Sequence, residues 1–265
     1  MNAEKIKDTA RSLYAAHRQK TQVAFPIELS AEEAYAVQKK VVGEHLRAGL
    51  HPAGRKIGFT IRSKWAELGI HEPDFGRVFH EYVFADGTTL HMDDFSQPML
   101  ETEIAVTLKE GIPGGKIDLQ RVANAVDCVA ASFEIVDFRT REGRSAFEII
   151  ADNAAFGACV VNEKKQNRAA AALKAERVEV YKNGCPVVAG NFSDILDGPL
   201  SSLLWLAKRL DAVGEPLQAK DLILTGSAIA PFPIEAGDTF RANFSTLEEI
   251  TVAFDDRNIF HKGGR

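Results

Sequence analysis

The sequence predicts an α+β fold in which a helical N-terminal lobe, residues 1–55, precedes a mixed β body, residues 56–265. Apolar residues recur at helical spacing through the first 50 residues, and short β-type runs bounded by turn residues take over from Lys56 onward. Helices and strands do not alternate regularly, which argues against a βαβ arrangement. No repeat or low-complexity linker separates the two parts, so we treat them as one functional unit.

Two helices are expected in the N-terminal lobe. Ile6, Ala10 and Leu13 fall on one face of the first helix. The segment Ser30-Ala31-Glu32-Glu33 has the pattern of a capping box and begins the second helix, which ends near Gly49.

The β body is expected to contain several strands, a hairpin and two more helices. Asn183-Gly184 lies between two β-type runs and predicts a tight hairpin, because both residues tolerate a positive φ. The remaining predicted elements are a helix over residues 119–129, a strand over 132–139, a helix that begins near Pro199, and a C-terminal strand meander formed by residues 222–225, 240–244 and 250–254.

Composition excludes several classes of protein. The net charge of −5 and the pI near 5.9, without a Lys/Arg-rich run, argue against nucleic-acid binding. The polar N-terminus lacks the apolar segment of a signal peptide, and no stretch has the length of a membrane span. The three cysteines are far apart and predict buried free thiols in a reducing compartment, so we expect a cytoplasmic protein.

The segment Pro98–Leu108 predicts a strand with two carboxylates on one face. Side chains alternate along a strand, so Glu101 and Glu103 lie on one face, while Leu100 and its even-numbered neighbours form a core face. Two adjacent carboxylates repel each other unless they are solvated or bridged by a cation. On spacing alone, a solvated strand face is the simpler interpretation.

Glu134 changes this interpretation. It lies between Phe133 and Ile135 in a predicted strand, where burial of an unpartnered carboxylate costs several kcal/mol. Three carboxylates that converge on one Mg²⁺ or Mn²⁺ ion would account for Glu101, Glu103 and Glu134 together and would leave metal positions open for a chelating substrate.

Around these residues the chain resembles the 2-oxopent-4-enoate (2-hydroxypentadienoate) hydratase and 4-oxalocrotonate decarboxylase family of the fumarylacetoacetate hydrolase superfamily. Short segments carry the resemblance in the order of the family, from Lys56 almost to the C-terminus. They are Lys56-Ile57-Gly58-Phe59-Thr60, Pro73-Asp74-Phe75-Gly76, Glu101-Thr102-Glu103-Ile104-Ala105, Phe133-Glu134-Ile135-Val136-Asp137, Ala151-Asp152-Asn153-Ala154, Leu224-Thr225-Gly226-Ser227 and Ala236-Gly237-Asp238-Thr239-Phe240. The resemblance implies a mixed β-sheet roll or sandwich and a homo-oligomer.

The resemblance also implies roles for individual residues. Glu101, Glu103 and Glu134 would hold Mg²⁺ or Mn²⁺. Asp137 competes for the third ligand position, although strand alternation places it on the face opposite Glu134, where an ion pair with Arg139 is the alternative. Further roles fall on Lys56 and Asp74 as catalytic residues that face the substrate, and on Asn153, Thr225, Gly226 and Ser227 as substrate-binding residues.

Both Lys56 and Asp74 have simpler alternatives. Lys56 could be an exposed cation beside a glycine turn, and Asp74 could belong to the turn after Pro73. In a pocket that holds three carboxylates and a dication, a lysine ammonium would help to recruit an anionic substrate.

The activity implied is metal-dependent addition of water to a 2-hydroxy-2,4-dienoate, a small-molecule substrate of aromatic catabolism, to give a 4-hydroxy-2-oxo acid. The main alternative is decarboxylation of a 2-oxo-3-enedioate, which needs a cation for the distal carboxylate; Arg139, Arg141 and Arg144 are candidates. Hydrolysis of an acylpyruvate, with His71 or His80 recruited, and an inactive metal-binding homologue are further alternatives.

The chain departs from the family pattern at two places. Ala155-Phe156 stands where the hydratases carry a serine pair, and Asp197-Gly198-Pro199 replaces a Gly-His-Pro sequence. Both departures bear on the choice of substrate.

Overall fold

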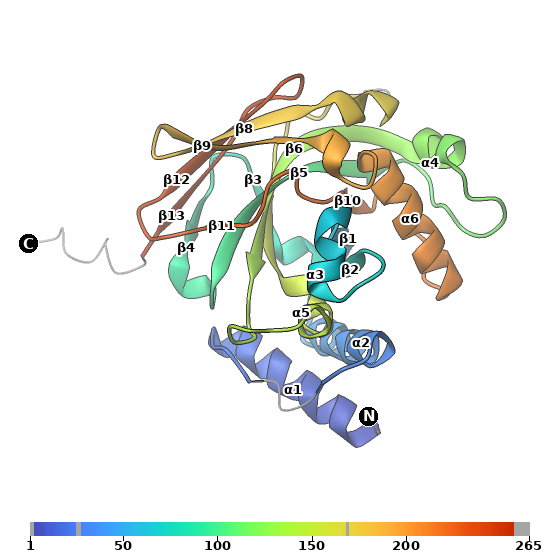
Figure 1. The fold of residues 1–265 in the computed structure, drawn as a ribbon, viewed down its shortest axis with the longest axis vertical. Helices are drawn as coiled ribbons and strands as arrows, with labels where there is room; N and C mark the ends of the chain where they lie inside the picture. Colours follow the sequence, from blue (N-terminus) through green and yellow to red (C-terminus); the bar gives the residue numbers. More distant parts are fainter. Residues whose placement is uncertain (1–2, 25–27, 168–169, 257–265) are drawn as a thin grey trace, which may run out of the picture.

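The computed structural model describes residues 3–24, 28–167 and 170–256, so the extreme ends of the two predicted regions, residues 1–2 and 257–265, lie outside it. In the described residues, two β-sheets form the body, and the helices lie below it and at one side (Figure 1). The α-helices are α1 (Ala3–Gln19), α2 (Ala31–Arg47), α3 (Trp65–Leu68), α4 (Leu119–Ala125), α5 (Ala146–Ala151) and α6 (Pro199–Ala212). Short 3₁₀ turns are η1 (Arg62–Lys64), η2 (His80–Tyr82), η3 (Met92–Asp94), η4 (Asn153–Ala155), η5 (Ala170–Ala175) and η6 (Phe192–Asp194).

The strands form an eight-stranded and a five-stranded sheet. The larger sheet has the order β2-β1-β10-β5-β6-β7-β3, with β11 paired to β5, and the smaller sheet has the order β4-β13-β12-β8-β9. The strands are β1 (Pro52–Gly58), β2 (Asp74–Phe79), β3 (Val83–Ala85), β4 (Thr89–His91), β5 (Pro98–Leu108), β6 (Val126–Asp137), β7 (Phe156–Val161), β8 (Arg177–Lys182), β9 (Cys185–Asn191), β10 (Leu222–Leu224), β11 (Phe232–Pro233), β12 (Thr239–Phe244) and β13 (Ile250–Asp255). This arrangement confirms the predicted α+β class with N-terminal helices.

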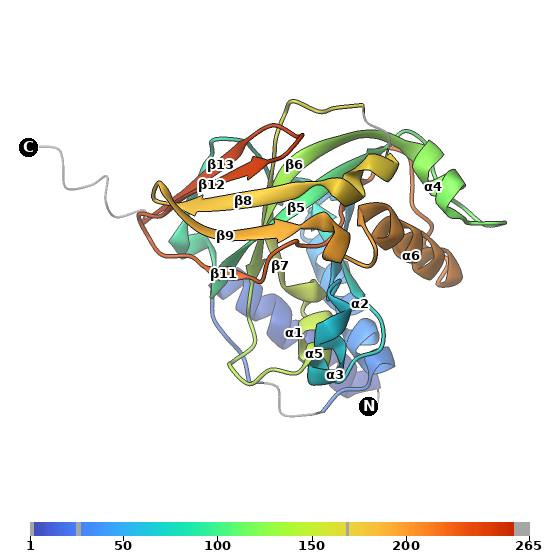
Figure 2. The same cartoon turned by 45° about the horizontal axis from the view of Figure 1, so that its top comes forward.

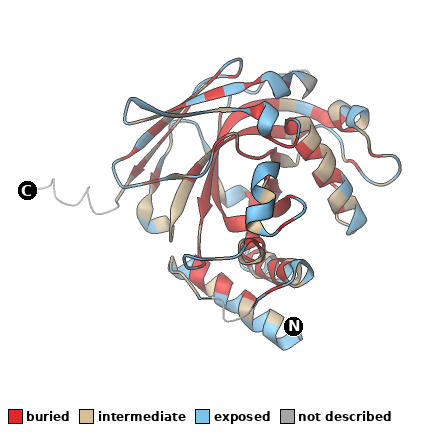
Figure 3. Ribbon diagram, in the orientation of Figure 1, coloured by how far each residue is buried: buried red, intermediate tan, exposed pale blue. Residues whose placement is uncertain are grey.

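The main core lies between the two sheets, where the even-numbered side chains of β5 meet apolar residues of β8, β12 and β13. Ile104 is fully buried there, as predicted from the alternation along Pro98–Leu108. Figure 3 shows that burial continues along β5 and β6 through the middle of the molecule. The odd-numbered face of β5 is also covered, since Ala105 packs with Phe79 and Phe156 in a second core.

The N-terminal helices pack beneath the larger sheet, beside α5 (Figures 1 and 2). Leu13, Val37 and Ile150 belong to one apolar cluster that joins α1 and α2 to α5. The capping box predicted at Ser30 is present, because Ser30 Oγ accepts a hydrogen bond from Glu33 N and the Glu33 carboxylate accepts one from Ser30 N. The lobe thus lies against the body, while its treatment as a separate region remains a prediction.

Two sequence expectations are wrong at the level of elements. The predicted helix over 119–129 ends at Ala125, because residues from Val126 onward pair with β5 and gain its ladder hydrogen bonds. The predicted C-terminal meander is split, since β10 lies in the larger sheet between β1 and β5, whereas β12 and β13 lie in the smaller one.

The Asn183-Gly184 hairpin is present, with positive φ at both residues. The three cysteines are free, but only Cys159 is buried as predicted, since Cys128 is half-buried and Cys185 is exposed. Among the helices of the described residues, none combines the length and the hydrophobicity that a membrane crossing requires.

Candidate active site

Strands β5 and β6 bring three glutamates together. Glu101 and Glu134 are direct partners in the antiparallel register, so both point to the same face, and Glu103 shares that face two residues further along β5. One oxygen of each carboxylate lies within 4.8 Å of the others. Glu103 and Glu134 have no exposed surface, so the interpretation as a solvated strand face is wrong.

These carboxylates fit a divalent cation. Glu103 Oε1 and Glu134 Oε2 are buried and accept no hydrogen bond from the described residues. Burial raises the pKa of Glu101 to about 8, and burial with the charge of Glu134 raises the pKa of Glu103 well above its usual range. The nearby Cys159 stays a thiol, because burial raises its pKa too. Oxygen donors of this kind suit Mg²⁺ and Mn²⁺, and a dication would offset their mutual repulsion.

Lys56, on β1, supplies a buried cation to the cluster. Its Nζ lies 2.9 Å from Glu134 Oε1 and donates a hydrogen bond of 3.0 Å to Ala154 O. Burial alone would lower the pKa of Lys56, but the surrounding carboxylates, Glu134 first, outweigh burial and raise it. Lys56 therefore stays protonated and is not an exposed cation.

Asp74 begins β2 and faces the same space. It pairs with Gly58 in the antiparallel register of β1 and β2, and a Cβ atom on Gly58 would lie only 2.1 Å from Asp74 Oδ1. The carboxylate is buried, and burial raises the pKa of Asp74 to about 6. A group with such a pKa can both give and accept a proton near neutral pH.

The segment after β10 supports the glutamates from the side. Gly226 N donates a hydrogen bond of 2.7 Å to Glu103 Oε2, whereas Glu103 Oε1 has no such partner. The Thr225 hydroxyl donates to Ile104 O, and the Ser227 hydroxyl donates to Ile229 O. Both hydroxyls are therefore bonded within the protein, although Ser227 lines the adjoining cavity.

The turn η4 adopts a left-handed conformation at three successive residues without a glycine. Asn153, Ala154 and Ala155 have φ values of 54°, 54° and 56°, which L residues adopt at a cost. The Asn153 amide holds the turn, since its Oδ1 accepts from Arg77 N at 2.7 Å and its Nδ2 donates to Arg77 O at 2.9 Å. Asn153 thus lies behind the turn, while Ala154 and Ala155 line the cavity.

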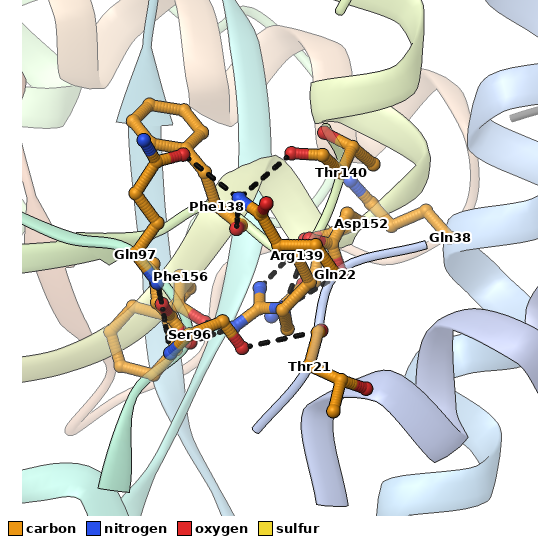
Figure 4. A network of polar contacts seen from close by, with 12 residues as sticks. Thr21, Gln22, Gln38, Ser96, Gln97, Phe138, Arg139, Thr140, Asp152 and Phe156 are labelled. Carbon is orange, nitrogen blue, oxygen red and sulfur yellow. Dashed lines mark hydrogen bonds and ion pairs between the residues drawn. The ribbon is translucent and has the colours of Figure 1, made fainter. Parts of the chain in front are cut away.

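Arg139 fixes the two ends of this turn. Its guanidinium donates to both Asp152 carboxylate oxygens at 2.9 Å and to Phe156 O at 3.0 Å (Figure 4). Asp137 belongs to this network, because it accepts hydrogen bonds from Ser96 N and Gln97 N at 2.8 Å and lies 3.5 Å from Arg139 Nη1. Its carboxylate is thus held by its own partners on the face opposite Glu134.

A cavity of about 850 Å³ opens from Lys56, Asp74 and Glu101. Its wall comes from η1, α3, β6, η4 and the segments before α6 and after β10. The candidate cations at 139, 141 and 144 and the histidines at 71 and 80 are not part of its lining.

Comparison with known proteins identifies the family to which the chain belongs. The family model for the fumarylacetoacetate (FAA) hydrolase C-terminal region matches residues 66–254. The 2-oxo-hept-4-ene-1,7-dioate hydratase of Escherichia coli is 31% identical over 257 residues, which cover 92% of this chain and 96% of the relative. The chain belongs to the fumarylacetoacetate hydrolase superfamily, in the 2-keto-4-pentenoate hydratase family.

Two further proteins are similar to this chain over nearly the full length. The 2-keto-4-pentenoate hydratase of Paraburkholderia xenovorans (strain LB400) is 29% identical over 265 residues and covers 98% of each chain. The structure of 4-oxalocrotonate decarboxylase from Pseudomonas putida G7, complexed with magnesium and adipate, superposes with a TM-score of 0.90 at 26% identity and covers 96% of this chain and 98% of its own. Like its relatives, the protein is an enzyme.

The two departures from the hydratase pattern have different consequences in this family member. Ala155 lines the cavity, so a hydroxyl is missing from its wall. Phe156 packs in the second core with Phe79 and is not part of the cavity lining. Asp197 lies at the cavity mouth, where its Oδ2 is 2.7 Å from Arg62 Nη1.

Two contributions were missed in the sequence, the Ala154 carbonyl and the space provided by Gly58. Gly226 was expected to bind substrate, and its amide instead donates to Glu103. The Ala154 carbonyl is a backbone group and carries no residue-type signal. Gly58 does carry one, because a glycine inside a strand indicates a close approach.

Proposed function

We propose that the enzyme is a divalent-metal-dependent hydratase, which adds water to a 2-hydroxy-2,4-dienoate of the 2-oxopent-4-enoate type and yields a 4-hydroxy-2-oxo acid. One observation carries the proposal: three glutamates, two of them fully buried, lie beside a buried lysine and a buried aspartate, and Lys56, Asp74 and Glu101 of this group line a large cavity. The hydratases among the full-length relatives support it.

In this proposal Glu101, Glu103 and Glu134 hold Mg²⁺ or Mn²⁺. The chemistry that such a cation supplies when bound is chelation of the substrate's C1 carboxylate and C2 oxygen, with withdrawal of electron density from the dienol. The orphaned oxygens of Glu103 and Glu134 support these ligands, and magnesium in the 4-oxalocrotonate decarboxylase structure supports the choice of metal. Asp137 remains the alternative ligand, but its present partners disfavour it.

Lys56 and Asp74 have separate proposed roles. Lys56 uses two of its three donors on Glu134 and Ala154 and keeps one for a substrate oxygen, where its charge favours the enolate. Asp74 moves protons: it delivers one to C5 while the C2 hydroxyl releases its proton to solvent and the dienol becomes a conjugated enone. It then accepts one from the water that adds at C4, and solvent returns a proton to C3.

The four residues that the sequence suggested for substrate binding have different roles in this proposal. Ser227 is a candidate through its place in the cavity lining, and Gly226 acts through Glu103. Asn153 and Thr225 shape the site through their own hydrogen bonds.

Decarboxylation of a 2-oxo-3-enedioate is the second candidate, because the 4-oxalocrotonate decarboxylase structure superposes over nearly the whole chain. The same metal chelate would serve both reactions. The two differ in what the distal end of the cavity must hold.

A product assay separates these candidates. The Mn²⁺-loaded enzyme is given 2-hydroxypenta-2,4-dienoate in one reaction and 2-oxohex-3-enedioate in another. We expect NMR to show 4-hydroxy-2-oxopentanoate from the first, and no reaction after EDTA treatment. Faster release of CO₂ from the second would favour the decarboxylase. Activity that survives EDTA would contradict a metal mechanism in either case.

We also propose a cytoplasmic homo-oligomer. Free cysteines support a reducing compartment, and β9, an edge strand with the exposed Val187, offers a surface for a second copy. Light scattering after size-exclusion chromatography gives the mass; a monomer of 29.0 kDa would contradict the oligomer.

A further inference from the structure

Much of the cavity wall is hydrocarbon. A volume of about 850 Å³ is in the range that holds drug-sized ligands, so space remains beyond a five-carbon acid. The side chains that surround this space are mostly apolar, among them Ile57, Phe59, Ile61, Leu68, Val136 and Phe138. Burial of an apolar substituent there stabilises the complex, whereas burial of a carboxylate removes its hydration and destabilises the complex.

The cations that line this cavity are already paired. Lys56 lies in the glutamate cluster, Lys64 Nζ is 3.1 Å from Glu67 Oε2, and Arg62 Nη1 is 2.7 Å from Asp197 Oδ2. Asp194 adds another negative charge to the lining. A second carboxylate on the substrate would therefore meet neutralised cations and like charges at the mouth.

The backbone around Asp197 has a defined conformation, although the side chains of Asp197 and Arg62 are both more than half exposed. Leu196, Asp197 and Gly198 have φ values of 45°, 70° and 117°, and Leu196 N donates a hydrogen bond of 3.2 Å to Thr60 O. This bond ties the loop before α6 to the segment that carries Arg62. The carboxylate of Asp197 is thereby kept opposite the guanidinium.

We infer that Asp197 is a specificity-determining residue: by neutralising Arg62 at the mouth of an apolar cavity, it restricts the enzyme to 2-oxo acids with an uncharged hydrocarbon tail and excludes those with a distal carboxylate. The inference rests on the proposed function for the identity of the 2-oxo acid end. It assigns the outer cavity to the tail of the substrate.

The test compares two ligands that differ only at the distal end. Calorimetry measures the binding of 2-oxohexanoate and 2-oxoadipate to the Mn²⁺-loaded enzyme. The wild type should bind 2-oxohexanoate at least about tenfold more tightly, because a distal carboxylate loses hydration against the apolar wall and meets no unpaired cation among the residues that line the cavity. In Asp197→Asn, 2-oxoadipate should bind about fivefold more tightly, as expected for one exposed charge pair, while 2-oxohexanoate changes less than about twofold.

Asparagine suits this variant because it tolerates a positive φ and keeps the size of the side chain. Adding Arg62→Gln to Asp197→Asn should remove the gain. Glu248→Gln, which changes the net charge equally but lies outside the cavity lining and pairs with Lys164, should leave both affinities unchanged.

Equal binding of the two acids by the wild type, an unchanged ratio in Asp197→Asn, or failure of both acids to bind would overturn the inference. Turnover of 2-hydroxypenta-2,4-dienoate, which has no distal group, is measured on the same samples. Its absence with selective binding intact would contradict the hydratase proposal and leave the tail selectivity supported.

Discussion

Glu103 and Glu134 are ionisable side chains without exposed surface, and they face the same side of one sheet. Lys56 compensates only part of this charge, since its ammonium contacts Glu134 at one oxygen. Buried carboxylates persist in a fold only with partners, so the oxygens without hydrogen bonds are best explained by a cation.

The glutamates are therefore expected to be required for metal binding. Glu103→Gln and Glu134→Gln should each weaken Mn²⁺ binding by about 100-fold or more, because each removes a charged ligand. Asp137→Asn should keep Mn²⁺ affinity within about threefold, since Asp137 bonds to backbone amides on the other face, but should lower the melting temperature. Calorimetry and thermal unfolding measure these effects. Loss of Mn²⁺ binding in Asp137→Asn alone would assign the third ligand to Asp137.

Alternation along a strand was enough to predict that Glu101 and Glu103 share a face and that Glu134 and Asp137 do not. It did not predict that this face is covered, because burial depends on which elements pack there. The contact of Lys56 with Glu134 depends likewise on the position of β1 in the sheet, which no local pattern encodes.

At the scale of elements, strand order assembles the site. β10 inserts parallel to β1 and antiparallel to β5, which brings the Gly226 amide to Glu103 and places β1 close enough for Lys56 to reach Glu134. Such a pairing joins segments that are far apart in the chain. The sequence predicted β10 as a strand, but its partners follow from packing of the whole sheet.

Gly58 makes room for Asp74 in this arrangement, so Gly58→Ala should displace the carboxylate. We expect kcat to fall by about 100-fold, as for loss of a positioned acid or base, with Mn²⁺ affinity nearly unchanged. The matched control is Gly43→Ala in α2, where only Arg47 Nη2 lies within 4 Å, at 3.9 Å. This control should raise the free energy of unfolding by about 0.5–1 kcal/mol and keep full activity. Normal turnover by Gly58→Ala would contradict the view that catalysis requires the Asp74 carboxylate in the space beside Gly58.

At the scale of the whole molecule, the helical lobe joins the body through buried aromatic side chains. His17 and His45 contact each other at a ring-centroid distance of 4.6 Å, and His45 lies 5.3 Å from Phe79 of β2. Arg139, which fixes the ends of η4, lies in the same small cavity as these histidines. The packing of the lobe and the shape of the active site therefore share one network.

This junction predicts a dependence of stability on pH. Burial, with the charge of Arg139, lowers the pKa of His45 from 6.5 to about 4. As the pH falls, His45 is protonated in the unfolded chain before it is protonated in the folded one. The stability that neutral His45 contributes to the fold is therefore complete above pH 6.5 and is lost as the pH falls toward 4. Relative to His45→Phe, the wild type should lose about 2 kcal/mol of unfolding free energy between pH 7.5 and pH 5. Urea unfolding at several pH values measures the difference. Parallel curves for the two proteins would contradict a neutral buried His45.

The most direct measurement is the anomalous scattering of a crystal grown with Mn²⁺. The predicted result is a manganese peak bound by the carboxylates of Glu101, Glu103 and Glu134, with the cavity beyond it open to the substrate. Absence of a peak at these carboxylates, or a peak bound by Asp137 in place of Glu134, would contradict the proposed site.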